Sequence, residues 1–141
     1  MHSLSFSYHE TSFRLPKTRA VREWILSIAA LHNSTIENIG VVFCTDSFLL
    51  EMNRQYLSHD YFTDIITFDY SEDKRLAGEL YISIDRVREN AKTMGIAFRD
   101  EVHRILVHGI LHLIGFSDKS KPNRKQMQEQ EDLALSLRSF V

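Results

Sequence analysis

The sequence has little of what marks secreted, membrane-spanning or broadly nucleic-acid-binding proteins. Its single cysteine, Cys44, excludes a disulfide within the chain, which suits a reducing compartment. No apolar run approaches the roughly 18 residues that cross a bilayer, and the first residues lack the pattern of a signal peptide. The net charge is only −2, so any contact with nucleic acid must use a local patch. We therefore expect a cytoplasmic protein that is not attached to a membrane.

The residues that are present are sufficient for one folded domain. Hydrophobic residues make up 43% of the 141 positions, and nine Phe and five Tyr make the chain rich in aromatic side chains. The only prolines, Pro16 and Pro122, stand at junctions between patterned segments, and there is no repeat, low-complexity tract or linker. A chain of this length typically forms a single domain, and we assign residues 1–141 to one.

The apolar periodicity predicts nine elements in the order β-α-β-α-β-β-α-α-α. Strands are expected at residues 4–8, 36–44, 64–70 and 80–84. Helices are expected from a first turn at Pro16 to Leu31, from a cap at Thr45 or Asp46 to Leu57, from a cap at Asp85 to Gly95, and at residues 99–114 and 124–137. Two central strands joined by a short connection favour an α+β fold, a small mixed four-stranded sheet covered by about five helices.

The most informative segment runs from His108 to Asp118 and has the spacing H-x-x-x-H-x-x-G-x-x-D. Side chains four residues apart lie on one face of a helix, so His108 and His112 can both direct a ring nitrogen at one ion. Gly115 stands where a helix ends with a residue that accepts positive φ. The chain can then turn back and offer Asp118 as a third ligand. We predict one zinc ion per chain, bound by these three residues on a central buried helix, with a fourth position open for water.

Two substitutions separate this pattern from the metalloprotease motif H-E-x-x-H-x-x-G-x-x-H. The general base of the proteases follows the first histidine, but Gly109 occupies that position here, which argues against a peptidase. A glycine inside a helix costs about 1 kcal/mol relative to alanine, so a strand or a substrate should approach the backbone at Gly109. Asp118 replaces the third histidine, and its negative charge should make the ion a weaker Lewis acid. The ligand set also leaves nickel, iron or manganese open.

Four blocks of the sequence resemble the YbeY family of bacterial rRNA maturation factors. The ligand segment is similar to that family's H-G-x-L-H-L-x-G-[YF]-D-H. Residues 52–68 resemble its L/M-N-x-x-[YF]-R-x-x-D-x-x-T-D-V-L-S-F. Residues 78–83 resemble its G-D-I-x-I-S strand, and residues 127–133, with Glu129 and Glu131, its M-x-x-x-E-E-x-I/L ending. Together the blocks cover roughly residues 50–135.

This resemblance implies a single metal-dependent, hydrolase-like domain with a defined activity. The family's activity is that of a zinc-dependent, single-strand-specific endoribonuclease, which helps to mature the 3′ end of 16S rRNA and acts in ribosome quality control. The implied partners are single-stranded rRNA and the small ribosomal subunit, with no DNA and no membrane. By the same resemblance, His108, His112 and Asp118 are the metal ligands.

Three positions depart from the family pattern. Asp118 stands where most members have histidine, and Ser117 stands where aspartate is usual. Leu57 occupies the position of the family's arginine, a residue expected to stabilise the charge of a phosphoryl transition state. The role of the family's arginine would then fall to Arg54, His59 or Lys119. The alternative is a non-catalytic ribosome-assembly or RNA-binding factor in which the metal is structural.

The remaining candidates follow from what RNA cleavage needs. No glutamate of the ligand helix lies beside the histidines to act as a base, so the catalytic groups beyond a metal-bound water are sought among His59, Glu79 and Arg54. Substrate phosphates need positive charge, and a run of four cations without an acid follows the third ligand: Lys119, Lys121, Arg124 and Lys125. Tyr61 and Phe62 could stack on unpaired bases.

Overall fold

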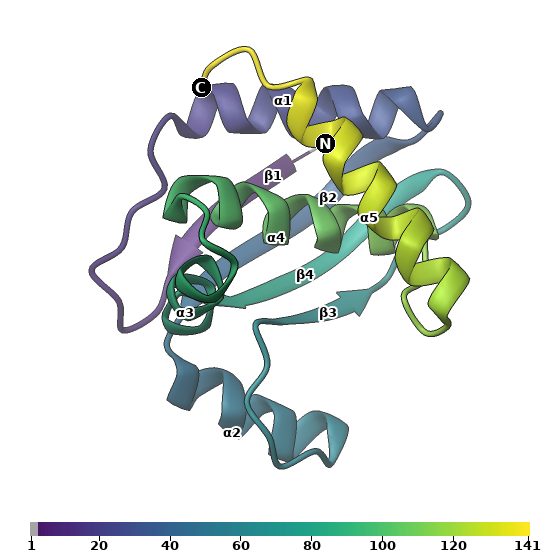
Figure 1. Ribbon diagram of the computed structural model, residues 1–141. Coiled ribbons are helices and arrows are strands. Elements are labelled where there is room, and N and C mark those ends of the chain that lie inside the picture. Colours follow the sequence, from purple (N-terminus) through teal and green to yellow (C-terminus); the bar gives the residue numbers. More distant parts are fainter. Residues whose placement is uncertain (1–2) are drawn as a thin grey trace.

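The computed structural model describes residues 3–141 and contains four strands and five helices in that range (Figure 1). In chain order they are β1 (Ser3–Tyr8), α1 (Thr18–Leu31), β2 (Thr35–Cys44), α2 (Asp46–Leu57), β3 (Ile65–Asp69), β4 (Arg75–Ser83), α3 (Ile84–Met94), α4 (Phe98–Ile114) and α5 (Lys121–Ser136). This order and the α+β class confirm the prediction from periodicity.

The four strands form one mixed sheet in the order β1-β2-β4-β3. Strands β1, β2 and β4 run parallel, and β3 pairs with β4 in the antiparallel direction. The short connection from β3 to β4 makes this antiparallel pair possible, whereas parallel neighbours need a crossover segment. Strand β3 is last in this order, so it is an edge strand with one backbone edge unpaired within the sheet.

Helix α4 lies at the centre of the helical layer, with α1 and α3 beside it on the sheet and α5 crossing over it (Figure 1). Its buried apolar residues belong to one continuous core with Val41 and Phe43 of β2 and Leu80 and Ile82 of β4. Helix α2 lies away from this layer, and its Leu49 joins a separate small core with residues of β2 and β3. The predicted central, buried ligand helix is therefore confirmed.

At Gly109, helix α4 packs so closely on the sheet that a side chain would not fit without a shift of its neighbours. A Cβ atom at this position would lie 2.9 Å from the terminal methyl groups of both Ile65 and Leu80. The close approach expected from the sequence is made by strands β3 and β4. This packing fixes the depth of α4, and with it the height of His108 above the sheet edge.

Several predicted boundaries were wrong by a few residues, because local capping decided them. Helix α1 begins after Pro16, since Lys17 has a positive φ of 54° and precedes the first helical turn. The cap of α3 is Ser83, which accepts from the N–H of Arg86, so the strand before it ends earlier than predicted. The carboxylate of Asp85 instead accepts from the N–H of Asp46.

The last helix and the fourth strand begin earlier than the periodicity indicated. The hydroxyl of Ser120 caps α5, so Pro122 lies in the first turn, where its missing N–H has no cost. Strand β4 begins at Arg75 because its first residues pair with β2 and bury Leu76 in the core. No helix in residues 3–141 combines the length and hydropathy required to cross a membrane.

Candidate metal centre

Helix α4 places His108 and His112 one turn apart, with their rings side by side. The ring centroids are 4.7 Å apart and the planes meet at 82°, and both side chains are mostly buried, at 16% and 28% exposure. Spacing of four residues places two side chains next to each other on one face of any helix. Their neighbours hold the two rings in place, and the part of each ring that stays exposed lines the cleft described below.

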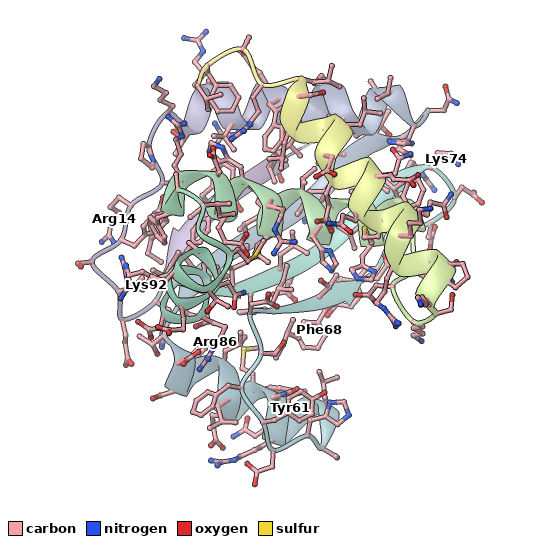
Figure 2. All side chains as sticks on the ribbon, in the orientation of Figure 1. Arg14, Tyr61, Phe68, Lys74, Arg86 and Lys92 are labelled. Carbon is pink, nitrogen blue, oxygen red and sulfur yellow. The ribbon has the colours of Figure 1, made fainter. Side chains whose placement is uncertain are left out.

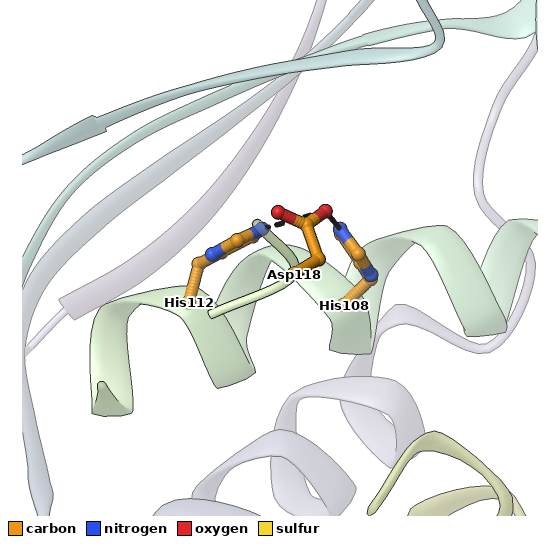
Figure 3. A group of neighbouring side chains, drawn as sticks. All are labelled: His108, His112 and Asp118. Atoms are coloured by element: carbon orange, nitrogen blue, oxygen red, sulfur yellow. Dashed lines mark ion pairs between the residues drawn. The ribbon is translucent and has the colours of Figure 1, made fainter. Parts of the chain in front are cut away.

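The turn after α4 brings Asp118 back over the two rings (Figure 3). Gly115 ends the helix with φ of 127°, a conformation that side chains disfavour. The N–H of Phe116 then donates to the carbonyl of Leu111 at 3.0 Å, which reverses the chain direction. Asp118 thereby reaches the histidines without a longer loop.

The three side chains present a set of donor atoms suited to one metal ion. The Oδ2 atom of Asp118 lies 3.5 Å from Nε2 of His108 and 3.5 Å from Nε2 of His112, and all three donor atoms lie within 4.8 Å of one another. Ligands about 2.0–2.1 Å from a tetrahedral zinc ion stand roughly 3.3–3.5 Å apart. Two imidazoles and one carboxylate at this spacing fit such an ion.

Glu131 of α5 contacts the ring nitrogen of His108 that is not directed at the predicted metal position. Its Oε2 atom lies 2.6 Å from Nδ1 of His108, so the Nδ1–H donates to the carboxylate and Nε2 is free to bind a metal. Burial lowers the pKa of His108, but the hydrogen bond and charge of Glu131, together with the charges of Asp118 and Asp64, raise the pKa overall. The same contact, with that of Arg104, keeps the pKa of Glu131 below its ordinary value despite burial.

A buried ionic chain continues from Glu131 into the core. The Arg104 guanidinium donates to Glu131 at 2.9 Å and in two bonds, of 2.7 and 2.6 Å, to Glu101. Glu101 is completely buried. The sequence contained Glu131 in a recognised block, but no local spacing connects it with a histidine 23 positions away, and its role emerges only from the crossing of α4 and α5.

The three predicted ligands open into a cleft of about 450 Å³ along the free edge of β3. Strand β3 and the α2–β3 loop supply most of the opposite wall, including Thr63, Asp64, Thr67 and Asp69. Within residues 3–141, no Lys or Arg side chain lines the cleft. The site is therefore acidic before a metal is considered, and a bound cation would be its main source of positive charge.

The structure brings one of the three predicted catalytic candidates into this cleft. His59 lines it, with its ring stacked on Tyr61 at 5.1 Å and its Nδ1 3.0 Å from the Tyr61 hydroxyl. Arg54 is exposed, is paired with Asp60 and Glu51, and does not line the cleft.

Glu79 lies on the other side of the sheet. Its neighbours Gly78 and Leu80 face α4, so alternation turns Glu79 away. Its carboxylate accepts from the hydroxyls of Tyr70 and Tyr81.

Asp64 is a cleft residue to which the sequence assigned no role. Its Oδ2 atom accepts from Nδ2 of Asn90 at 3.1 Å, which fixes the carboxylate at the start of β3. Its charge also contributes to the raised pKa of His108, after burial, Glu131 and Asp118. Together with His59 it gives the cleft two groups able to accept a proton, on the wall facing the ligands (Figure 2 shows Tyr61 in the loop that carries His59).

The four predicted RNA-binding cations lie in the segment that follows Asp118 in the chain. Lys119 follows the ligand directly, and Lys121, Arg124 and Lys125 lie in the first turns of α5. All four side chains are exposed, and none forms an ion pair with an acid in the described part of the chain. Leu57 lines the cleft itself and is 41% exposed. These four positive charges therefore lie outside the cleft, next to the third predicted ligand.

Comparisons with known proteins match one family over almost the whole chain. The family model described as Endoribonuclease YbeY matches residues 5–138. Endoribonuclease YbeY of Bacteroides thetaiotaomicron is 46% identical over 137 residues, which cover 96% of this chain and 100% of that protein. The protein of the same name from Cytophaga hutchinsonii is 43% identical, covering 98% and 97%.

A solved structure shares the fold. The solution structure of TM1509 from Thermotoga maritima superposes with a TM-score of 0.71, covering 95% of this chain and 87% of that one, at 24% sequence identity. At this identity the likeness concerns the fold alone.

Proposed function

This chain belongs to the endoribonuclease YbeY family, and we propose that it is a zinc-dependent endoribonuclease specific for single-stranded RNA. The observation that carries the zinc site is the geometry of His108, His112 and Asp118, whose donor atoms converge beside an open cleft. We further propose that residues 1–141 act as one hydrolase domain in the cytoplasm. Its substrate there would be the 3′ end of 16S rRNA, during maturation and quality control of the small ribosomal subunit.

The residues of the cleft divide the chemistry among themselves. His108, His112 and Asp118 would hold the ion, and Glu131 keeps His108 in the tautomer that leaves Nε2 free. A bound zinc ion would supply Lewis acidity for a phosphate oxygen or lower the pKa of a water molecule. RNA carries a nucleophile of its own, the 2′-OH, and His59 or Asp64 would accept its proton from the facing wall.

Selectivity for unpaired RNA would follow from the shape and composition of the entrance. The exposed ring of Tyr61 lines the cleft wall on the α2–β3 loop, where a splayed base can stack on it. The ring of Phe62 is also exposed, but it does not line the cleft, and the Arg86 guanidinium lies over it. Lys119, Lys121, Arg124 and Lys125 would contact phosphates beyond the third ligand. A duplex presents neither free base faces nor a single narrow strand to the edge of β3.

A second function deserves consideration because of Leu57. With leucine at this position, the cleft has no Lys or Arg within residues 3–141 to stabilise a phosphoryl transition state. A ribosome-assembly or RNA-binding factor with a structural metal would need no such cation. The two functions differ in one observable, cleavage, because both predict a bound metal.

The test compares cleavage of a single-stranded 16S 3′-end fragment by wild type, His112→Ala and His9→Ala, all purified identically. His9 is a surface histidine paired with Glu10, far from the ligands in the chain, and serves as the matched control. We expect cleavage by wild type and His9→Ala, its loss in His112→Ala, and its loss and recovery when zinc is removed from wild type and restored. Equal cleavage by all three proteins would indicate a contaminant, and no cleavage by wild type would favour the assembly factor.

A further inference from the structure

A second cavity, of about 450 Å³, lies on the other side of the loop that carries Asp118. Three regions distant in sequence border it: the end of α1, the turn before β4, and the ligand loop with the first turns of α5. The residues that matter for its chemistry are His32, Lys74, Phe116, Ser117, Asn123 and Gln126. This cavity shares no lining residue with the metal cleft.

The charge of this cavity is opposite to that of the cleft. Within the described residues no carboxylate lines it, and Lys74 forms no ion pair there. The Lys74 ammonium lies close enough to His32 that its charge, after partial burial, lowers the pKa of that imidazole. A cationic group without a counter-charge, set in a polar cavity, is a suitable contact for one phosphate.

Its other lining groups suit a nucleobase. The ring of Phe116 packs against the core, meets His32 edge to face with centroids 5.3 Å apart, and is partly exposed toward the cavity, where it offers an aromatic surface for stacking. Asn123 and Gln126, one turn apart on α5, offer amide donors and acceptors toward the same space. A phosphate contact, an aromatic face and paired amides together match a nucleotide better than a simple anion.

The position of the cavity connects it with the metal cleft. Ser117 lines the cavity and its neighbour Asp118 lines the cleft, so a single turn of chain separates them. Strand β3 forms the cleft wall as far as Asp69, and the turn that follows carries Lys74 just before β4. A strand of RNA that follows the edge of β3 past the ligands is thereby directed toward Lys74.

The remaining cavity beside the metal centre is less suitable for a polyanion. It measures about 500 Å³ and lies between α4 and α5. Two of its three arginines, Arg104 and Arg138, are already paired with acids. Four carboxylates line it: Asp100, Asp118, Glu131 and Asp132. Charge therefore favours the path toward Lys74.

We propose that the Lys74 cavity binds a nucleotide of the RNA strand that flanks the cleaved bond. Lys74 contacts the phosphate, Phe116 stacks on the base, and Asn123 and Gln126 hydrogen-bond to its edge. The inference rests on the proposed nuclease function and adds a subsite to it. The site sets the length of RNA that the protein prefers, because only a strand that extends beyond the metal cleft can reach it.

Binding of two RNAs tests the subsite without relying on cleavage. A trinucleotide fills the metal cleft alone, whereas a dodecanucleotide reaches the Lys74 cavity, and 2′-O-methyl groups on both prevent cleavage through the 2′-OH. Dissociation constants are measured by fluorescence anisotropy for wild type, Lys74→Glu and Lys92→Glu. Lys92 is an exposed lysine of α3 on the opposite side of the molecule (Figure 2), so Lys92→Glu makes the same change of charge away from the cavity.

We expect Lys74→Glu to weaken binding of the dodecanucleotide about ten-fold, as for loss of one phosphate contact plus repulsion, and to leave the trinucleotide unchanged. Lys92→Glu should match wild type with both RNAs, and Lys74→Arg should retain tight binding. Equal weakening by Lys74→Glu and Lys92→Glu, or equal weakening for both RNA lengths, would overturn the proposal.

Acylation of lysines provides a second readout on the wild-type protein. The dodecanucleotide should slow acylation of Lys74, whereas the trinucleotide and inorganic phosphate should not. Protection by inorganic phosphate alone would identify a free-anion site and overturn the nucleotide assignment. If wild type shows length-dependent binding and protection but never cleaves RNA, the nuclease function fails while the subsite stands; if it binds neither RNA, both fail.

Discussion

The Nδ1 atom of His108 and the Oε2 atom of Glu131 lie 2.6 Å apart, although 23 residues separate them in the chain. This contact joins α4 to α5 and connects the predicted metal centre with the buried pair of Arg104 and Glu101. The final helix is thus part of the centre, although it supplies no predicted metal ligand. Stability of the fold and affinity for a metal should be coupled through this one hydrogen bond.

Glu131→Gln should weaken zinc binding about ten- to a hundred-fold, the usual effect of losing a carboxylate that orients a histidine ligand. An amide at position 131 has no charge to favour the Nδ1–H tautomer. The measurement is a zinc titration of metal-free protein in competition with a chromophoric chelator. Glu129→Gln, on an exposed position of the same helix, is the control; an equal affinity for both variants would contradict the role of Glu131.

Arg104→Met should lower the free energy of unfolding by about 3–5 kcal/mol, the range for removing one partner of a buried ion pair. Two buried carboxylates, Glu101 and Glu131, would lose their counter-charge. Burial alone lowers the pKa of Arg104, but its bonds to these two acids raise it overall, which shows how strongly they favour the cation.

Urea denaturation of metal-free protein measures this loss. Arg99→Met, at an arginine 58% exposed in the first turn of the same helix, should change the free energy of unfolding by less than about 1 kcal/mol. A loss of similar size in the two variants would mean that the buried network contributes little.

His103 should make the protein less stable as the pH falls below about 6.5. Its ring is 3% exposed between Trp24 and Phe140, and its Nδ1 accepts from Arg138 at 2.8 Å. Burial, and then the charge of Arg138, lowers its pKa to about 4; Arg99 adds to this and Asp100 opposes it. Between the two values the unfolded chain binds the proton more readily, so stability is complete above about pH 6.5 and falls toward about pH 4.

The size of this effect should be roughly 2–3 kcal/mol, from 1.36 kcal/mol per unit of pKa. It is measured by urea denaturation of metal-free wild type and His103→Gln at about pH 7.5 and about pH 4.5. The glutamine amide can still accept from Arg138 but does not titrate. The variant should lose less stability on acidification than wild type; parallel losses would assign the pH dependence to other groups.

Leu57→Arg should increase cleavage of single-stranded RNA by about ten-fold or more, because one well-placed donor to a developing charge contributes on this scale. Position 57 is at the end of α2 and lines the metal cleft, which has three carboxylates and, in residues 3–141, no Lys or Arg. Rates are compared under single-turnover conditions with those of wild type and Leu57→Gln, the uncharged control. Unchanged rates in Leu57→Arg would show that a cation at this position does not limit the reaction.

The sequence by itself determined the features that depend on short-range geometry. The spacing of His108 and His112, the positive φ at Gly115 and the return of Asp118 all lie within one helix end. Helix period and chain reversal fix such contacts without reference to the rest of the fold. The order of nine elements was predictable for the same reason, since each has its own apolar period.

Tertiary structure decided the features that depend on which surfaces meet. Leu80, Tyr81 and Ile82 are all hydrophobic, so alternation does not indicate which face of β4 is buried. Helix α4 covers the face of Gly78 and Leu80, which turns Glu79 away from the metal cleft. Asp64 and Glu131 reach the site only because β3 is an edge strand and α5 crosses α4. These contacts join residues far apart in the chain, and packing of the whole core, which no local pattern encodes, selects them.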